Sequence, residues 1–137
     1  MRVREIMTSP VQTVPVGSSL REAAQMMRAR RMRHLVLVDA AGHVAGVLSD
    51  RDVRASQPSM HLMKDEEMRI KMLSLSRVED AASTGTYTVR EEDSVAKALR
   101  IMRDQKIGCL PVVHADGTPV GVITGIDVLD LALSLLT

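Results

Sequence analysis

The chain has 137 residues, the length of one ordinary domain, and 45% of them are apolar, which is enough for a hydrophobic core. Eighteen Lys and Arg against 17 Asp and Glu leave a net charge of +1, so no global charge favours nucleic acid or a membrane surface as a partner. The single cysteine, Cys109, excludes an intrachain disulfide and fits a reducing compartment. Because no stretch approaches the roughly 18 apolar residues of a membrane span and no apolar signal region follows Met1, we expect a cytoplasmic protein without a membrane partner.

A gap-free repeat with an offset of 75 residues organises the chain. Residues 3–53 align with residues 78–128, and fifteen of the 51 aligned pairs are identical. Two glycine pairs, Gly42 with Gly117 and Gly46 with Gly121, keep the same phase as the apolar residues. The chain is therefore predicted to contain two copies of one structural unit.

The first copy begins with a short extended segment at residues 13–14. Ser18 and Ser19 then offer an N-cap for a helix, whose apolar stripe follows the i, i+3, i+4, i+7 spacing at Leu20, Ala23, Ala24 and Met27. A compact apolar strand at 35–38, a turn that ends at Gly42 and a second strand at 44–48 predict a β-hairpin. Another helix is expected to begin near Asp50.

The second copy repeats this order, with an extended segment at 88–89, a helix capped by Ser94, strands at 110–113 and 120–123, and a helix from Gly125. The predicted fold class is α/β (α+β): two tandem motifs, each a short strand–helix–β-hairpin–helix unit, related by pseudo-twofold symmetry. Because a unit of about 50 residues buries too little surface alone, we expect the two copies to share one core.

The predicted organisation is motif 1 at residues 1–58, a helical connector at 59–77 and motif 2 at 78–137. After the break at Pro58, residues 60–63 and 68–75 look helical, and the connector lacks glycine. Its methionine stripe fits either core packing or an interface with a partner; the stripe consists of Met60, Met63, Met68 and Met72.

A hydroxyl residue and a carboxylate recur where the second strand of each copy meets the following helix. Ser49 and Thr124 fall at this boundary, where a hydroxyl and free helix N–H groups together suit a phosphate. Asp52 and Asp127 follow about one helical turn later, where a carboxylate can accept both hydroxyls of a ribose. The same residue types at a helix start also form an ordinary cap, and this alternative remains open.

The repeat resembles a pair of CBS motifs, often called a Bateman module, of the small bacterial stand-alone type. The resemblance extends from about Val3 to Leu133. Its most specific pieces are Gly46-Val-Leu-Ser-Asp-Arg-Asp52 and Gly121-Val-Ile-Thr-Gly-Ile-Asp127, which occupy the same place in the two copies. The resemblance implies that Ser49 and Thr124 bind phosphate, and that the two aspartates bind ribose.

The same resemblance places the base against the early extended segment and the first hairpin strand of each motif. The residues implied are Thr13, Val14, Met32 and His34 in the first copy and Thr88, Val89, Ile107 and Cys109 in the second.

Two differences separate the copies. Val36 replaces the proline found at Pro111, and Arg51 lies between Ser49 and Asp52, where it could meet a phosphate. We therefore expect the first site to prefer a charged phosphate tail.

Other chemistry-bearing residues do not form a recognisable site. The four histidines at 34, 43, 61 and 114 are scattered and do not predict a metal site, and no phosphate loop, nucleophile elbow or HExxH motif is present. The arginines at 28, 30, 31 and 33 fit a solvated helix end or a reach toward ligand phosphate, and without aromatic stacking residues they do not favour nucleic acid. We therefore do not expect an enzyme.

The resulting hypothesis is a regulatory module that senses an adenosine-containing ligand in clefts between the two motifs and needs no resident cofactor. The candidates are AMP, ADP, ATP, NAD(H) and S-adenosylmethionine, and an effector protein elsewhere would read the change. The apolar C-terminal run at 128–136 predicts a homodimer. The alternative is a dimeric interaction scaffold of the same fold without a physiological nucleotide.

Overall fold

The computed structural model describes residues 1–56 and 65–137, and the chain divides into two compact units. The β1–β3 unit consists of residues 12–41 and 45–86, and the β4–β6 unit consists of residues 1–11, 42–44 and 87–137. The predicted class, a mixed α and β fold built twice, is confirmed. The predicted helix at 60–63 lies outside the described residues.

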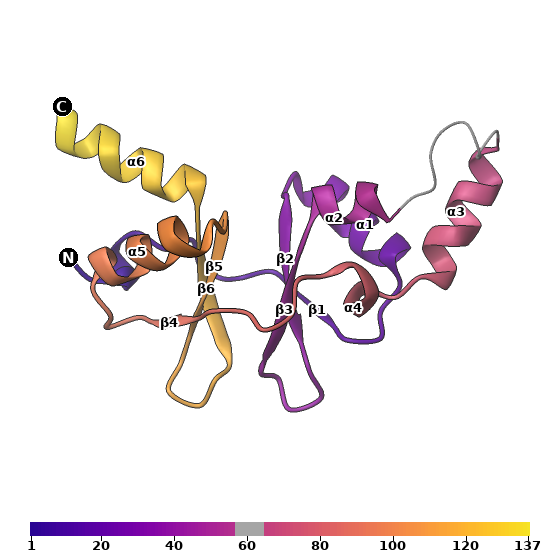
Figure 1. The fold of residues 1–137 in the computed structure, drawn as a ribbon, viewed down its shortest axis with the longest axis horizontal. Helices are drawn as coiled ribbons and strands as arrows, with labels where there is room; N and C mark the ends of the chain where they lie inside the picture. Colours follow the sequence, from indigo (N-terminus) through magenta and orange to yellow (C-terminus); the bar gives the residue numbers. More distant parts are fainter. Residues whose placement is uncertain (57–64) are drawn as a thin grey trace. The chain divides into compact units, whose positions relative to one another are not determined.

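The β1–β3 unit carries a three-stranded sheet in the order β1-β2-β3, in which β1 runs parallel to β2. Figure 1 shows α1 and α2 beside this sheet, with α3 beyond them. The elements are β1 (Thr13–Pro15), α1 (Leu20–Arg30), β2 (His34–Val38), β3 (Val44–Ser49), α2 (Asp50–Ala55), α3 (Glu66–Leu75) and α4 (Val78–Ala81).

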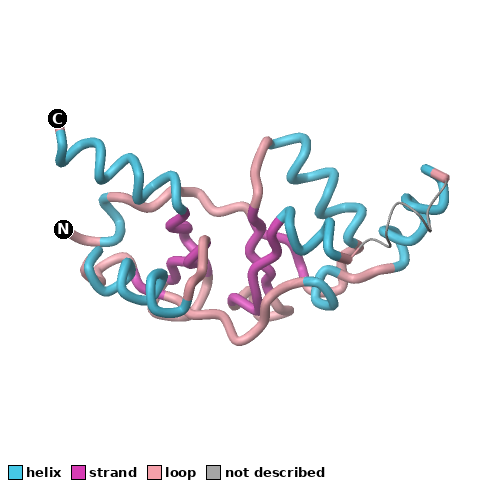
Figure 2. Tube along the Cα trace, turned by 45° about the horizontal axis from the view of Figure 1, so that its top comes forward, coloured by secondary structure: helices cyan, strands magenta, loops and turns pink. Residues whose placement is uncertain are grey.

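The β4–β6 unit repeats the arrangement, with β4 parallel to β5 and β5 antiparallel to β6. In Figure 2 the helices of each unit lie to one side of its own strands. The elements are the 3-10 helix η1 (Val3–Glu5), β4 (Val89–Arg90), α5 (Val95–Gln105), β5 (Cys109–Val113), β6 (Pro119–Thr124) and α6 (Gly125–Leu136).

The first helix of each motif begins at the serine that the sequence indicates. The Ser19 hydroxyl accepts a hydrogen bond from the Glu22 N–H, and the Ser94 hydroxyl accepts one from the Lys97 N–H, each at 3.1 Å. Each bond satisfies a helix N–H group that has no partner within the helix, so the predicted N-caps are confirmed.

The prediction of one shared core is wrong, because each unit has its own cluster of buried residues. Val14, Leu35 and Leu48 belong to the cluster of the β1–β3 unit, while Val89 and Ile123 belong to that of the β4–β6 unit. Each cluster is completed by the leading residues of the other motif, which supply the additional apolar surface.

This exchange of leading segments between the motifs is clearest at two valines that align in the repeat. Val3, from the start of the first motif, is fully buried in the core of the β4–β6 unit, and Val78 is fully buried in the core of the β1–β3 unit. The connector helix α3 also joins the β1–β3 core through Leu73. Met68 and Met72 on the same helix are 52% and 41% exposed, so they do not pack in the core of this chain.

Two glycines allow the exchanged segments to approach the last strand of each sheet. A Cβ at Gly121 would lie 2.7 Å from the Thr8 carbonyl oxygen, and a Cβ at Gly46 would lie 2.6 Å from the Ser83 carbonyl oxygen. Carbon and oxygen cannot approach so closely without a shift of the backbone, so both positions need glycine.

We predict that Gly121→Ala lowers the free energy of unfolding by about 1–3 kcal/mol, because the added methyl group displaces the Thr8 backbone. Urea denaturation monitored by circular dichroism measures the change. The matched control is Gly108→Ala, where an added Cβ meets no atom within 4 Å. Equal stability of the two variants would contradict the close approach.

Candidate ligand-binding site

The first motif fixes a carboxylate at the corner between β3 and α2. The Ser49 hydroxyl accepts a hydrogen bond from the Asp52 N–H at 3.0 Å, and Asp52 Oδ2 accepts one from the Ser49 N–H at 2.8 Å. The Asp50 N–H donates to the Arg33 carbonyl oxygen at 2.9 Å, which holds the start of α2 beside the start of β2. This reciprocal cap orients the half-buried Asp52 side chain.

His34 lies at the same corner as the first residue of β2. Partial burial lowers the pKa of its imidazole below the ordinary value of 6.5, while the carboxylates of Asp50 and Asp52 act in the opposite direction. The imidazole is therefore neutral at pH 7. A neutral imidazole can donate one hydrogen bond and accept another, which suits the mixed edge of a purine.

The second motif builds a similar corner between β6 and α6. Asp127 Oδ2 accepts hydrogen bonds from the Thr124 N–H at 2.8 Å and from the Thr124 hydroxyl at 3.3 Å. Cys109, at the position of His34, pairs with Thr124 in the β5–β6 register. Burial, followed by the charge of Asp127, raises the pKa of its thiol to about 12, so the thiol stays protonated at neutral pH.

The extended segments lie further along the sheets than these corners. Thr13 pairs with Val36, two residues after His34, which corresponds to about 7 Å along the strand. Val14 and Val89 are core residues with exposed fractions of 4% and 2%. Their side chains pack inside their own units, so these two positions can offer a ligand their backbone groups only.

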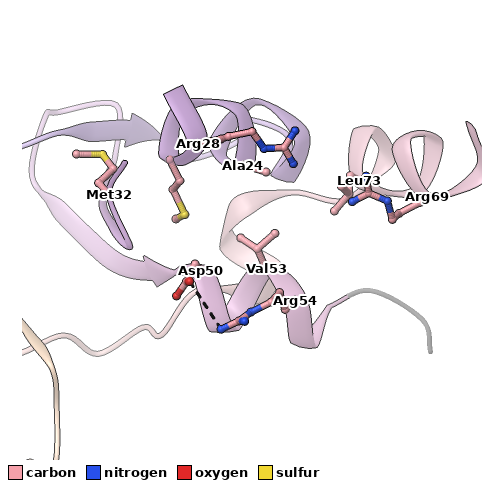
Figure 3. Close-up of a pocket in the computed structure, with 9 residues that line it drawn as sticks. Ala24, Arg28, Met32, Asp50, Val53, Arg54, Arg69 and Leu73 are labelled. Atoms are coloured by element: carbon pink, nitrogen blue, oxygen red, sulfur yellow. Dashed lines mark ion pairs between the residues drawn. The ribbon is translucent and has the colours of Figure 1, made fainter. Parts of the chain in front are cut away.

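Met32 faces a different hollow, which the helices of the β1–β3 unit form. The hollow has a volume of about 370 Å³ and an apolar floor, and Figure 3 shows its arginines on three separate helices. Asp50 and Arg54 form an exposed ion pair of 3.7 Å at its edge. The complete lining is Ala24, Met27, Arg28, Met32, Asp50, Val53, Arg54, Arg69 and Leu73.

Two hollows of the β4–β6 unit contain other predicted residues. Thr88 and Val89 border one of about 470 Å³. Asp127 borders one of about 390 Å³, where Glu5 and Asp130 add two further carboxylates. Three carboxylates repel a phosphate group, whereas hydroxyl donors suit them. Ile107, the counterpart of Met32, is half-buried against the core of its unit.

Sequence reasoning missed Thr8, which the structure brings to the second corner. Its hydroxyl donates to Asp127 Oδ1 at 2.7 Å, across 119 residues of chain. The available signal was the alignment of Thr8 with Ser83 in the repeat, just before the extended segments. Arg51, which the sequence singled out, is exposed on α2.

In residues 1–56 and 65–137, no group of three or more His, Cys, Asp or Glu side chains lies close enough together to hold a metal ion. No helix in the described part of the chain is long and apolar enough to span a membrane.

We predict that His34 titrates below pH 6.5 in an NMR titration, and that Asp52→Asn lowers its pKa further. The Asp52 carboxylate favours the imidazolium, so its neutralisation must favour the uncharged ring. Asp104→Asn, which neutralises an exposed carboxylate paired with Arg103, is the control and should leave the His34 pKa unchanged. An increase in the His34 pKa with Asp52→Asn would contradict the assigned corner.

Comparison with known proteins agrees with this double architecture. The family described as CBS domain matches residues 3–58 and 78–134. A CBS domain-containing protein of Dictyostelium discoideum is 29% identical over 134 residues, which cover 98% of this chain and 92% of the relative. The crystal structure of a putative acetoin utilization protein from Vibrio cholerae is 29% identical, with a TM-score of 0.78 over 99% of this chain and 93% of that chain.

Two further crystal structures share the fold at lower identity. CBSX2 in complex with AMP is 24% identical, with a TM-score of 0.78 over 99% of this chain and 98% of its own. The CBS domain pair of protein MJ0100, in complex with 5′-methylthioadenosine and S-adenosyl-L-methionine, is 22% identical, with a TM-score of 0.79 over 98% and 97%. The two matched segments therefore show that this chain belongs to the CBS domain family and carries a tandem pair of CBS domains.

Proposed function

We propose that this CBS domain pair is a regulatory module that binds an adenosine-containing ligand at its strand–helix corners. The observation that carries the proposal is the repeated geometry of the corner. In both motifs an aspartate Oδ2 accepts the N–H of the hydroxyl residue at 2.8 Å, and the carboxylate remains half-buried. A carboxylate held in this way can accept the hydroxyls of a ribose.

The family supplies the class of ligand, since similar folds have been crystallised with AMP and with S-adenosyl-L-methionine. The charged residues around the two corners differ, so the two motifs favour different ligands. The exposed Arg51 beside Asp52 favours a charged phosphate tail in the first motif. The carboxylates around Asp127 favour a ligand with less negative charge in the second. AMP, ADP, ATP, NAD(H) and S-adenosylmethionine are the ligands to test.

Regulation follows if the ligand contacts one conformation of the module better than another, because binding then shifts the population toward that conformation. An effector protein would read the shift, and the module itself would catalyse no reaction. The competing function is an interaction scaffold that binds no nucleotide. The two differ in one measurable property, since only a binder of the native state is stabilised by the ligand.

We predict that one of these adenosyl ligands raises the unfolding temperature and that GTP does not. A ligand at 100 times its Kd stabilises the protein by about 2.7 kcal/mol. Thermal unfolding of wild type, Asp52→Ala and Asp127→Ala identifies the motif in use, because loss of its carboxylate removes the ligand-induced shift.

Both alanine variants also lose a helix cap, so the shift caused by the ligand is compared rather than the unfolding temperature itself. Asp104→Ala, at the exposed ion pair with Arg103, is the control that keeps both corners. The scaffold function would be favoured if millimolar concentrations of every adenosyl ligand left the unfolding temperature unchanged.

We also propose that a second copy of this chain covers α6. None of the twelve residues of this helix is buried. Ile126, Leu129, Leu133 and Leu136 are 59–82% exposed, and their spacing of three and four residues places them on one face. An exposed apolar stripe of this kind is typical of an interface between proteins.

The expected result is that Leu133→Glu converts a dimer into a monomer, measured by size-exclusion chromatography with light scattering. A carboxylate in the middle of an apolar interface loses its hydration without gaining a partner. Leu135→Glu is the matched control, because Leu135 is 73% exposed and lies off the stripe. A monomeric wild-type protein would contradict the proposed dimer.

A further inference from the structure

The two ribose-binding carboxylates that the proposed function requires are not equally available. Asp52 Oδ2 accepts the Ser49 N–H, and within the described residues Asp52 Oδ1 accepts no hydrogen bond. Both oxygens of Asp127 are occupied. Oδ2 accepts two bonds from Thr124, and Oδ1 accepts the hydroxyl of Thr8 at 2.7 Å.

The backbone of Thr8 is fixed in this position. Its N–H donates to the Val122 carbonyl oxygen at 2.8 Å, and its carbonyl oxygen accepts the Val122 N–H at 3.0 Å. Gly121 leaves room for this contact. The Thr8 side chain is exposed, so its hydroxyl can leave Asp127 by a rotation about χ1 without any change in these backbone bonds.

The first corner offers an internal comparison, because Ser83 occupies the position of Thr8. Ser83 makes the same pair of backbone hydrogen bonds, with Val47, at 3.0 and 3.1 Å. Its hydroxyl, however, makes no hydrogen bond to Asp52 in the described structure, since Asp52 Oδ2 accepts the Ser49 N–H alone. The two motifs therefore share a backbone arrangement and differ in one side-chain contact.

We infer that the Thr8 hydroxyl competes with the ligand for Asp127, and that the second motif consequently binds the ribose more weakly than its own carboxylate allows. This inference rests on the proposed function. A ribose presents two neighbouring hydroxyl donors, which need two free acceptor positions on the carboxylate. Among the described residues, Asp52 accepts one hydrogen bond and keeps acceptor positions on both oxygens. Asp127 accepts three and keeps one position, on the Oδ1 that Thr8 already contacts, so a ribose must displace Thr8 to place both hydroxyls.

The competition makes Thr8 a residue that sets the relative affinity of two otherwise similar sites. The first motif fills at low ligand concentration, and the second fills only at higher concentration. A module with two such thresholds responds to its ligand over a wider range of concentration than two equal sites do. Because Thr8 lies in the leading segment of the first motif, that segment adjusts a site that the last strand and helix of the second motif form.

The test measures AMP binding by isothermal titration calorimetry in an Asp52→Ala background, where the second motif provides the remaining ribose carboxylate. Thr8→Val removes the hydroxyl and keeps the shape and strand preference of the side chain. Hydrogen bonds to charged groups are worth enough that its removal should tighten the Kd for AMP by about 3–10-fold. With 2′,3′-dideoxy-AMP, which lacks the two ribose hydroxyls, the same change should have no effect.

Two control variants separate competition from a structural effect. Ser83→Ala, the corresponding change at the first corner, should leave the Kd for AMP unchanged. Thr8→Ser keeps the hydroxyl and should bind AMP like its parent, whereas a purely structural role of the threonine methyl group would weaken binding. Circular dichroism confirms that each variant is folded.

The inference would be overturned if Asp52→Ala/Thr8→Val bound AMP no more tightly than Asp52→Ala does. It would also be overturned if wild type bound AMP and the double variant did not. The proposed function would survive that result, because wild type would still bind through Asp52. Failure of wild type and of every variant to bind AMP would contradict the proposed function for this ligand, and the inference with it.

Discussion

Each motif depends on a short antiparallel contact between its last strand and the leading segment of the other motif. Two backbone hydrogen bonds join Thr8 to Val122, and two join Ser83 to Val47. The same leading segments bury Val3 and Val78 in the core of the opposite motif, where their own N–H groups donate to Asp93 and Ser18. A motif of about 50 residues has little apolar surface of its own. The valine from the other motif and the paired backbone segment therefore complete its core.

The same contact determines what can happen at the ligand corner. Thr8 and Ser83 are hydrogen-bonded to the strand that leads into the hydroxyl–carboxylate pair of each corner. Their carbonyl oxygens approach Gly121 and Gly46 so closely that only glycine fits there. The backbone contact at the corner is therefore the same in the two motifs, and the differences at the corners come from side chains. One corner has a neutral histidine and an exposed Arg51, while the other has a buried thiol and a carboxylate occupied by Thr8.

These differences give the two proposed sites separate chemical preferences. Positive charge beside Asp52 suits a phosphorylated ligand, and the acidic hollow beside Asp127 suits a ligand that carries less negative charge. The helices that follow also differ, since α2 has six residues and α6 has twelve. The longer helix carries the apolar stripe proposed to meet a second copy, so the proposed dimer contact and the proposed weaker site belong to the same motif.

Local chemistry in the sequence determined most of the architecture. The 75-residue repeat, the serine N-caps, the glycine turns and the alternation of apolar runs predicted the order of helices and strands, and the paired Ser/Thr–Asp positions predicted both corners. These features act over a few residues, and a repeat shows them twice. The hydroxyl and carboxylate of each pair are three residues apart, so a helix start was sufficient to bring them together.

Only the tertiary structure decided which motif each leading segment completes, and thus that the chain has two cores rather than one. It also decided that Val14 and Val89 point into those cores, and that Met32 faces the hollow between helices. The contact between Thr8 and Asp127 joins residues 119 positions apart. No local pattern encodes such a contact, because it depends on which strand edge the leading segment pairs with, and that choice is made by the packing of the whole unit.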